Sequence, residues 1–124
     1  LATYIENKCL CHIDNAPKNI LFCPGRYYFI DFAKSKFTFP ETDITHLLLF
    51  WAADFPYPFL QSSTLSFINT YLSILKLDSA RWHTSLQKNI RLFDKRRKIF
   101  GKPSGKQPIA VQKANRKWLT ELTL

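Results

Sequence analysis

Four polar residues in the first third of the chain have the types and the order that metal-dependent phosphoryl transfer needs. His12, Asp14 and Asn19 lie close together, and Asp31 follows after a short segment. Carboxylate and amide oxygens suit Mg²⁺, which completes its octahedron with water and substrate phosphate oxygens. A second carboxylate beside such a site can orient a substrate hydroxyl or accept its proton. Each of these residues alone is common in turns, but together they predict a metal site at Asn19 and Asp31 with Asp14 facing the hydroxyl.

A β-hairpin would bring these residues together. Residues 19–23 and 27–31 are apolar segments on either side of a Pro-Gly turn, which predicts two strands joined by a loop of about three residues. In that register Asn19 lies opposite Asp31, with the two Cβ atoms roughly 5 Å apart. A slip by one residue would turn the two side chains to opposite faces.

Two segments carry a resemblance to a known family. His-Ile-Asp-Asn-Ala-Pro-Lys-Asn at residues 12–19 resembles the catalytic loop of the protein-kinase-like superfamily, and Ile-Asp-Phe-Ala at residues 30–33 resembles its magnesium-binding Asp-Phe-Gly segment. Ala33 replaces the glycine of protein kinases. The resemblance implies that ATP and Mg²⁺ are cofactors and gives these roles: Asp14 the catalytic Asp, Asn19 and Asp31 the cofactor and metal ligands, His12 a structural brace, and Lys18 a further catalytic candidate.

The spacing after Asp31 distinguishes between branches of that superfamily. Only residues 34–42 precede Asp43, which opens an apolar helical run, so there is no room for an activation loop. This arrangement resembles the aminoglycoside phosphotransferase, choline kinase and lipopolysaccharide kinase group, in which an Asp at the position of Asp43 supports the catalytic loop. The implied acceptor is a hydroxyl-bearing small molecule or a glycolipid, and the implied location is the cytoplasm or the inner face of a membrane.

The resemblance implies an α+β fold. We expect a kinase-like C-terminal lobe at residues 1–101, in which a short β-hairpin carries the catalytic loop and the metal-binding Asp and a mainly α-helical bundle follows. A linker at residues 102–108 and a basic helix at residues 109–124 would complete the chain. No glycine-rich phosphate loop or partner Lys precedes the catalytic loop. We therefore expect a fragment whose N-terminal lobe is missing and which is inactive alone.

The helical part is predicted from apolar spacing and from helix-terminating residues. We expect helices over residues 43–53, from residue 63 or 64 to residue 76, and from a cap at Asp78 to residue 100, with Gly101 as the stop signal. His46 in the first of these helices is expected to be packed or hydrogen-bonded, and not to be a ligand.

The chain has a net charge of +9, which is concentrated in its last third. Residues 81–124 hold 12 Lys or Arg against 2 Asp or Glu, whereas residues 1–80 hold 6 against 7. This band is either a solvated helix face or a surface for an anionic substrate, an anionic membrane or nucleic acid. The alternative function is therefore a noncatalytic, pseudokinase-type or basic binding module for anionic lipid or nucleic acid. The candidate patch consists of Arg91, Lys95, Arg96, Arg97 and Lys98.

The three cysteines lie near the catalytic loop. Cys9 and Cys11 would share one face of a strand, and with Cys23 and His12 they make a zinc site imaginable, although the spacing matches no strong zinc pattern. Reduced thiols buried as small apolar groups are the preferred interpretation, in agreement with a reducing cytoplasm. No apolar run has the roughly 18 residues that a membrane span needs.

Overall fold

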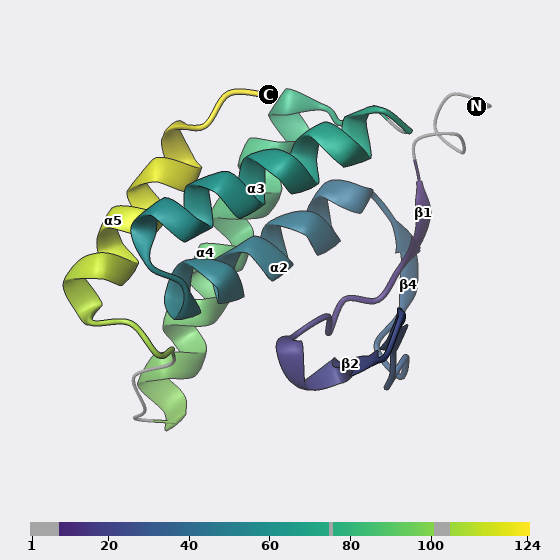
Figure 1. Ribbon diagram of the computed structural model, residues 1–124, viewed down its shortest axis with the longest axis horizontal. Coiled ribbons are helices and arrows are strands. Elements are labelled where there is room, and N and C mark those ends of the chain that lie inside the picture. Colours follow the sequence, from purple (N-terminus) through teal and green to yellow (C-terminus); the bar gives the residue numbers. More distant parts are fainter. Residues whose placement is uncertain (1–7, 75, 101–104) are drawn as a thin grey trace.

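The computed structural model describes residues 8–74, 76–100 and 105–124, and the side chains of these residues apart from 97–100. This part of the chain contains two antiparallel two-stranded sheets and four α-helices, which confirms the expected α+β fold. Figure 1 shows the strands on one side and the helices on the other. The elements are β1 (Cys9–Cys11), the short 3₁₀ helix η1 (Pro17–Asn19), β2 (Ile20–Cys23), β3 (Arg26–Phe29), β4 (Lys36–Thr38), α2 (Pro40–Asp54), α3 (Tyr57–Leu72), α4 (Ser79–Phe100) and α5 (Ile109–Glu121).

Helix α2 is the centre of the lobe, because it contacts α3, α4, α5 and β1. Pro40 occupies its first turn, where a missing N–H costs nothing, and two acidic residues in the same turn suit the positive end of the helix dipole. The helix is buried on most of its circumference. The core consists of Ile44, Leu48, Leu49 and Ala52 of α2 with Leu60, Ile68, Trp82, Leu86, Phe93 and Leu119 of the other helices.

The start of α4 is held against the start of α2. The Asp78 carboxylate caps α4 by accepting a hydrogen bond of 2.7 Å from the Arg81 N–H, as the sequence predicts. The buried Glu41 carboxylate accepts hydrogen bonds from the Asp78 N–H and from Nε of Arg81, both at 3.2 Å. These contacts fix α2 and α4 relative to each other.

Helix α5 packs on the opposite end of α2. The buried Asn115 amide donates to the carbonyls of Ala52 and Phe55, each at 2.9 Å. The described residues of the expected linker are attached to the same end of α2, because the Gln107 N–H donates to the Ala53 carbonyl at 3.0 Å. Gly105 lies so close to α2 that a Cβ there would be 2.6 Å from the Ala53 carbonyl oxygen.

The helix boundaries differ from the predicted ones. Helix α2 begins at residue 40 instead of 43, and α3 spans residues 57–72 instead of a range from 63 or 64 to 76. Pro58 lies in the first turn of α3, where proline is tolerated, so the helix can begin before residue 63. The predicted stop at Gly101 lies outside the described residues.

The hairpin forms, but its predicted register is wrong by one residue. Cys23 pairs with Arg26 and Ile20 with Phe29, so only two residues, Pro24 and Gly25, make the turn. Gly25 has φ +82°, which fits the second central position of a type II turn. Asn19 therefore does not lie opposite Asp31.

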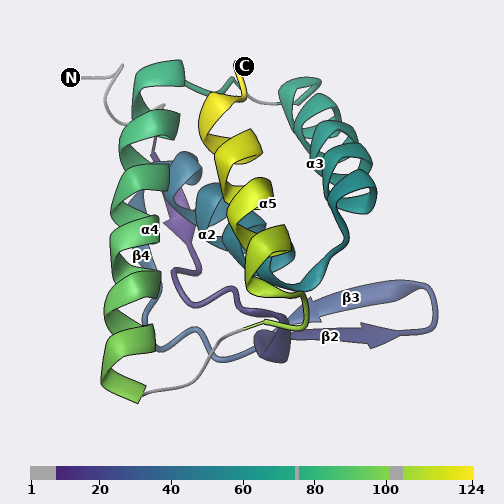
Figure 2. The same cartoon turned by 90° about the vertical axis from the view of Figure 1, so that its left-hand side faces the viewer.

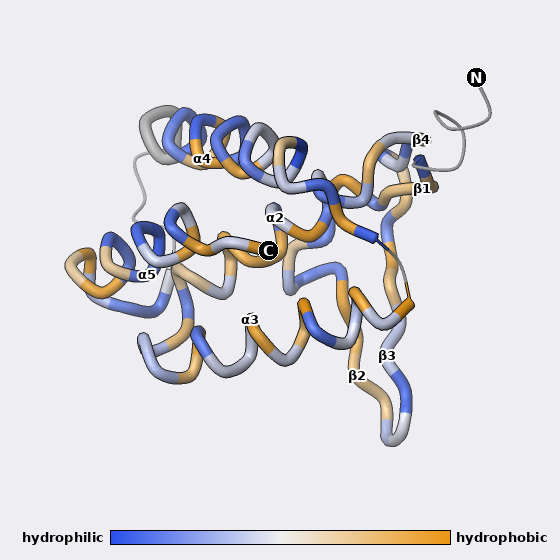
Figure 3. The backbone as a smooth tube through the Cα atoms, turned by 90° about the horizontal axis from the view of Figure 1, so that it is seen from above, coloured by the Kyte–Doolittle hydropathy of each residue, from blue (hydrophilic) through white to orange (hydrophobic). Residues whose placement is uncertain are grey.

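The β2–β3 hairpin extends away from the helices (Figure 2) and buries little. Phe22 is 66% exposed and Tyr27 is 72% exposed, and the apolar colouring of β2 in Figure 3 lies apart from the helical core. The second sheet, in which β1 pairs with β4, lies closer to the helices, since β1 contacts α2. This sheet was not predicted. None of the helices in the described ranges is long and apolar enough to cross a membrane.

Candidate active site

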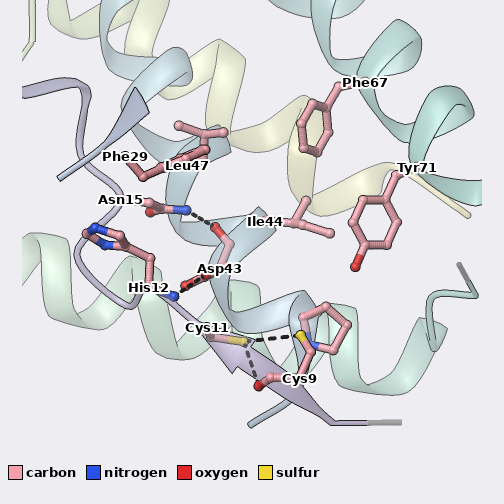
Figure 4. Close-up of a pocket in the computed structure, with 11 residues that line it drawn as sticks. Cys9, Cys11, His12, Asn15, Phe29, Asp43, Ile44, Leu47, Phe67 and Tyr71 are labelled. Carbon is pink, nitrogen blue, oxygen red and sulfur yellow. Dashed lines mark hydrogen bonds between the residues drawn. The ribbon is translucent and has the colours of Figure 1, made fainter. Parts of the chain in front are cut away.

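The loop that follows β1 is held by one carboxylate of α2. The Asp43 side chain accepts hydrogen bonds from the N–H of His12 at 2.7 Å and from the N–H of Ile13 at 2.8 Å. Figure 4 shows Asp43 beside His12 and Asn15. Ile13 has φ +71°, which is strained for a β-branched residue, so the loop needs outside support. Asp43, the expected loop support, supplies it.

A second contact joins the loop to α2 through Asn15. Its amide nitrogen donates to the Asp43 carbonyl at 2.8 Å, and its amide oxygen accepts a hydrogen bond from Nδ1 of His46. Burial lowers the pKa of His46 to about 4, with nearby Arg96 adding to the effect, so the ring is neutral at pH 7. His46 is thus hydrogen-bonded, as expected. The role of Asn15 was missed, although a polar His on a buried helix face signals the need for a partner.

His12 links the candidate catalytic loop, residues 12–19, to the segment before Asp31. Its Nε2 lies 2.7 Å from the Ile30 carbonyl oxygen, which can only accept, so Nε2 carries the proton. The ring also packs on Phe32, with the centroids 4.7 Å apart. The buried Nδ1 has no partner among the described residues. His12 therefore lies between the two segments that carry the candidate catalytic and metal-binding residues.

Asn19 is the point where these two segments meet. Its amide nitrogen donates to the Asp14 carbonyl at 2.7 Å, and its own carbonyl accepts from the Ile30 N–H at 2.9 Å. The side-chain oxygen of Asn19 is thus the end left for another ligand. Asp31 follows Ile30 with φ +60° and is exposed. Despite the changed register, backbone contacts bring Asp14, Asn19 and Asp31 to one locality.

The donors in this locality are those that Mg²⁺ takes. A carboxylate and an amide oxygen are hard ligands, and Mg²⁺ commonly uses one or two protein oxygens beside phosphate and water. Asn19 is 5% exposed and held by two hydrogen bonds, so its oxygen is preorganised, whereas the exposed Asp31 is open to solvent and to a ligand. The residues present therefore fit a magnesium-nucleotide group.

A hollow of about 400 Å³ opens beside Asp14. It lies between the candidate catalytic loop, α2, α4 and the segment before α5, and its walls combine apolar and charged groups. Its size is that of a small-molecule site. The charged residues that line it are Asp14, Lys18, Asp54 and Arg96.

The predicted anionic-partner patch lies on α4. Arg91, Lys95 and Arg96 are exposed, and Arg96 also lines the hollow beside Asp14. The side chains of Arg97 and Lys98 lie outside the described residues. The first two patch residues are one helical turn apart and therefore share a face.

The cysteines differ from one another in burial. Cys11 is buried, and burial raises the pKa of its thiol to about 12, so it is protonated and unreactive. Cys9 is half-buried, with its sulfur 3.7 Å from that of Cys11. Cys23 is exposed on β2, so the expectation of buried thiols is wrong there, because this hairpin has little to pack against. In the described ranges no three or more His, Cys, Asp or Glu side chains are grouped as for a metal ion.

Comparison with known families agrees with this geometry. The model of the phosphotransferase enzyme family, APH, matches residues 4–72, which include the candidate catalytic loop, both hairpin strands, α2 and α3. The chain belongs to this family. The resemblance to the aminoglycoside phosphotransferase branch is thereby confirmed, and the activity class is that of a phosphotransferase of the kinase type. The searches of curated proteins and of solved structures found no match.

Proposed function

We propose that the protein transfers the γ-phosphoryl group of MgATP to a hydroxyl of a small molecule or glycolipid. In this proposal a nucleotide-binding lobe completes the site for ATP. The observation that carries the proposal is the double attachment of Asn19, whose amide donates to the Asp14 carbonyl and whose carbonyl accepts from the Ile30 N–H. One residue thereby fixes the relative positions of the candidate catalytic Asp and the segment that bears Asp31. Such positioning is the main source of rate in phosphoryl transfer.

In this proposal each residue of the locality has a separate task. Asn19 and Asp31 would hold Mg²⁺, which when bound neutralises charge on the transferred phosphoryl group. Asp14 orients the acceptor hydroxyl and receives its proton. His12 keeps the two loops together through its bond to the Ile30 carbonyl, and Asp43 fixes the loop backbone.

The hollow beside Asp14 is the proposed acceptor site. It borders the catalytic Asp and offers charges of both signs, from Asp54 and from Lys18 and Arg96. A polar acceptor with several hydroxyl groups fits such walls better than a purely apolar one. The use of ATP makes the cytoplasm, or the inner face of a membrane, the proposed location.

The test is ATP turnover and phosphoryl transfer by the full-length protein over a panel of hydroxyl compounds. We expect Asp31→Ala and Asp14→Ala each to lower kcat about a hundredfold or more. Glu121→Ala, which removes an exposed carboxylate at the end of α5, is the matched control and should leave kcat unchanged. Equal rates for wild type and Asp31→Ala would remove the metal assignment.

A second candidate function rests on the exposed cations of α4. Arg91 and Lys95 are exposed and share a helix face, which favours contact with an anionic membrane surface. The readout is salt-sensitive binding to vesicles of anionic lipid. Arg91→Gln with Lys95→Gln should abolish binding, whereas Asp14→Ala should leave it unchanged. Binding that survives the double substitution would contradict this function, and binding to nucleic acid instead would indicate the other anionic partner.

A further inference from the structure

A second, smaller hollow lies where the catalytic loop, β4, α2 and α4 meet. Its volume is about 110 Å³, and Ile13 of the catalytic loop forms part of its wall. Asn89 fixes the surrounding helices, because its amide donates to the Thr42 carbonyl at 3.1 Å and to the Thr45 hydroxyl at 2.9 Å. The polar and charged groups around this hollow are Lys36, Thr42, His46, Ser85, Lys88 and Arg96.

The charge of this hollow is entirely positive. Lys36 of β4 and Lys88 and Arg96 of α4 all line it, and no carboxylate of the described residues does. Among the described residues the ion pairs are those of Arg81 with Glu41 and of Arg116 with Asp94, so none of the three cations has an acidic partner there. Three like charges around one small space repel one another unless an anion is bound between them.

Hydroxyl donors are also present at the hollow. Ser85 and Thr42 line it, and neither of their hydroxyls donates to another described residue. His46 is not one of these donors, because its one ring N–H, on Nδ1, is used for the Asn15 amide oxygen and its Nε2 is unprotonated. Charged and neutral donors from three elements therefore surround the same space, as in sites that bind oxyanions.

The volume restricts the class of ligand. Sites for drug-sized molecules have roughly 300–1,000 Å³, and this hollow is much smaller. A single tetrahedral oxyanion fits, whereas a nucleotide does not. We propose that Lys36, Lys88 and Arg96 form a binding site for one phosphate group, either inorganic phosphate or the phosphate of a phosphorylated metabolite.

The site is connected to the proposed acceptor site through Arg96. This residue lines both the 110 Å³ hollow and the 400 Å³ hollow beside Asp14. A bound phosphate group would hold the guanidinium and neutralise part of its charge, and would thereby change the electrostatic potential beside the acceptor. The binding itself does not depend on phosphoryl transfer, so it can be tested without a known acceptor.

The experiment is a calorimetric titration of the protein with inorganic phosphate in EDTA, at an ionic strength kept constant with chloride. We expect saturable binding at a stoichiometry of one, accompanied by a shift of the His46 ring resonances in NMR spectra. Lys36→Gln with Lys88→Gln should weaken binding about tenfold or more. The control, Lys113→Gln with Lys117→Gln, removes the same charge from exposed positions of α5 and should keep the affinity within about twofold.

Three results would overturn the proposal. The first is the absence of saturable binding, and the second is unchanged binding in the variant of Lys36 and Lys88. The third is an equal loss of affinity in the control variant, which would mean that the net charge of the protein attracts phosphate without a defined site. Circular dichroism melting establishes that both variants fold. In a second arm, glycerol 3-phosphate is added to the protein with bound phosphate. If it competes with phosphate, the site accepts the phosphate group of a metabolite, and if it does not compete, the site is restricted to the free ion.

Discussion

At the scale of single residues, Asp43 has the widest influence on the candidate active site. Its side chain accepts from the N–H groups of His12 and Ile13, and its carbonyl accepts from Asn15. Ile13 has a positive φ, and these hydrogen bonds to a charged group help to offset the strain. The geometry of the loop therefore depends on a carboxylate that need not contact any substrate.

We predict that Asp43→Asn lowers the free energy of unfolding by about 2 kcal/mol, because an amide replaces one of two accepting oxygens with a donor that faces an N–H. The measurement is urea denaturation followed by circular dichroism. Asp78→Asn is the matched control. Asn caps a helix as well as Asp does, so this change should cost less than about 0.5 kcal/mol. Equal effects of the two substitutions would contradict the role given to Asp43.

His46 predicts a dependence of stability on pH. Its pKa is about 4 in the folded protein against 6.5 for an ordinary His, so the unfolded chain binds a proton more readily between these values. The contribution of neutral His46 to the free energy of unfolding is complete above pH 6.5. It is lost as the pH falls towards 4, and the free energy of unfolding then decreases by up to about 3 kcal/mol. Urea denaturation of wild type and of His46→Gln at pH 7.5 and pH 4.5 measures this. The difference between the two proteins should shrink at the lower pH, and a constant difference would contradict the assignment.

At the scale of elements, two glycines with positive φ show how differently two connections are built. Gly25 turns the exposed hairpin with no atom within 4 Å of an added Cβ, whereas Gly105 lies against α2. We predict that Gly25→Ala costs about 1 kcal/mol, from backbone strain alone. Gly105→Ala should cost about 3 kcal/mol or more, because steric overlap with the Ala53 carbonyl adds to the strain.

Thermal and urea denaturation of the two glycine variants give the comparison, with each variant serving as the control for the other. Equal costs would mean that residues 105–108 do not hold α5 against α2. Proteolysis provides a second readout, since release of this segment should expose α5 to cleavage in the Gly105 variant only.

Local patterns predicted the kinds of elements better than their boundaries or pairings. The hairpin between residues 19 and 31 is clear from its apolar segments and its turn, but one residue in the turn decides which side chains face each other. The cap at Asp78 was predicted because the interaction is local. The pairing of β1 with β4 and the contact between Asn15 and His46 join residues about 30 positions apart, and no local pattern specifies them.

At the scale of the whole molecule, the lobe extends beyond the segment that defines its family. The match covers residues 4–72, yet Trp82 and Leu86 of α4 and Leu119 of α5 complete the core. The proposed acceptor site is likewise formed by both parts of the chain, since Asp14 lies within the family match and Arg96 lies outside it. The candidate catalytic residues therefore lie within the family match, whereas the proposed acceptor site also includes a residue of α4, which lies outside the match.

The central claim is that Asn19 and Asp31 hold one metal ion and that Asp14 serves the acceptor. The affinity of the full-length protein for Mn²⁺-ATP, measured by electron paramagnetic resonance with Mn²⁺ in place of Mg²⁺, separates these tasks. We predict that Asp31→Ala weakens this affinity by about tenfold or more, whereas Asp14→Ala changes it by less than about twofold. An affinity that Asp31→Ala leaves unchanged, or that Asp14→Ala lowers equally, would contradict the account.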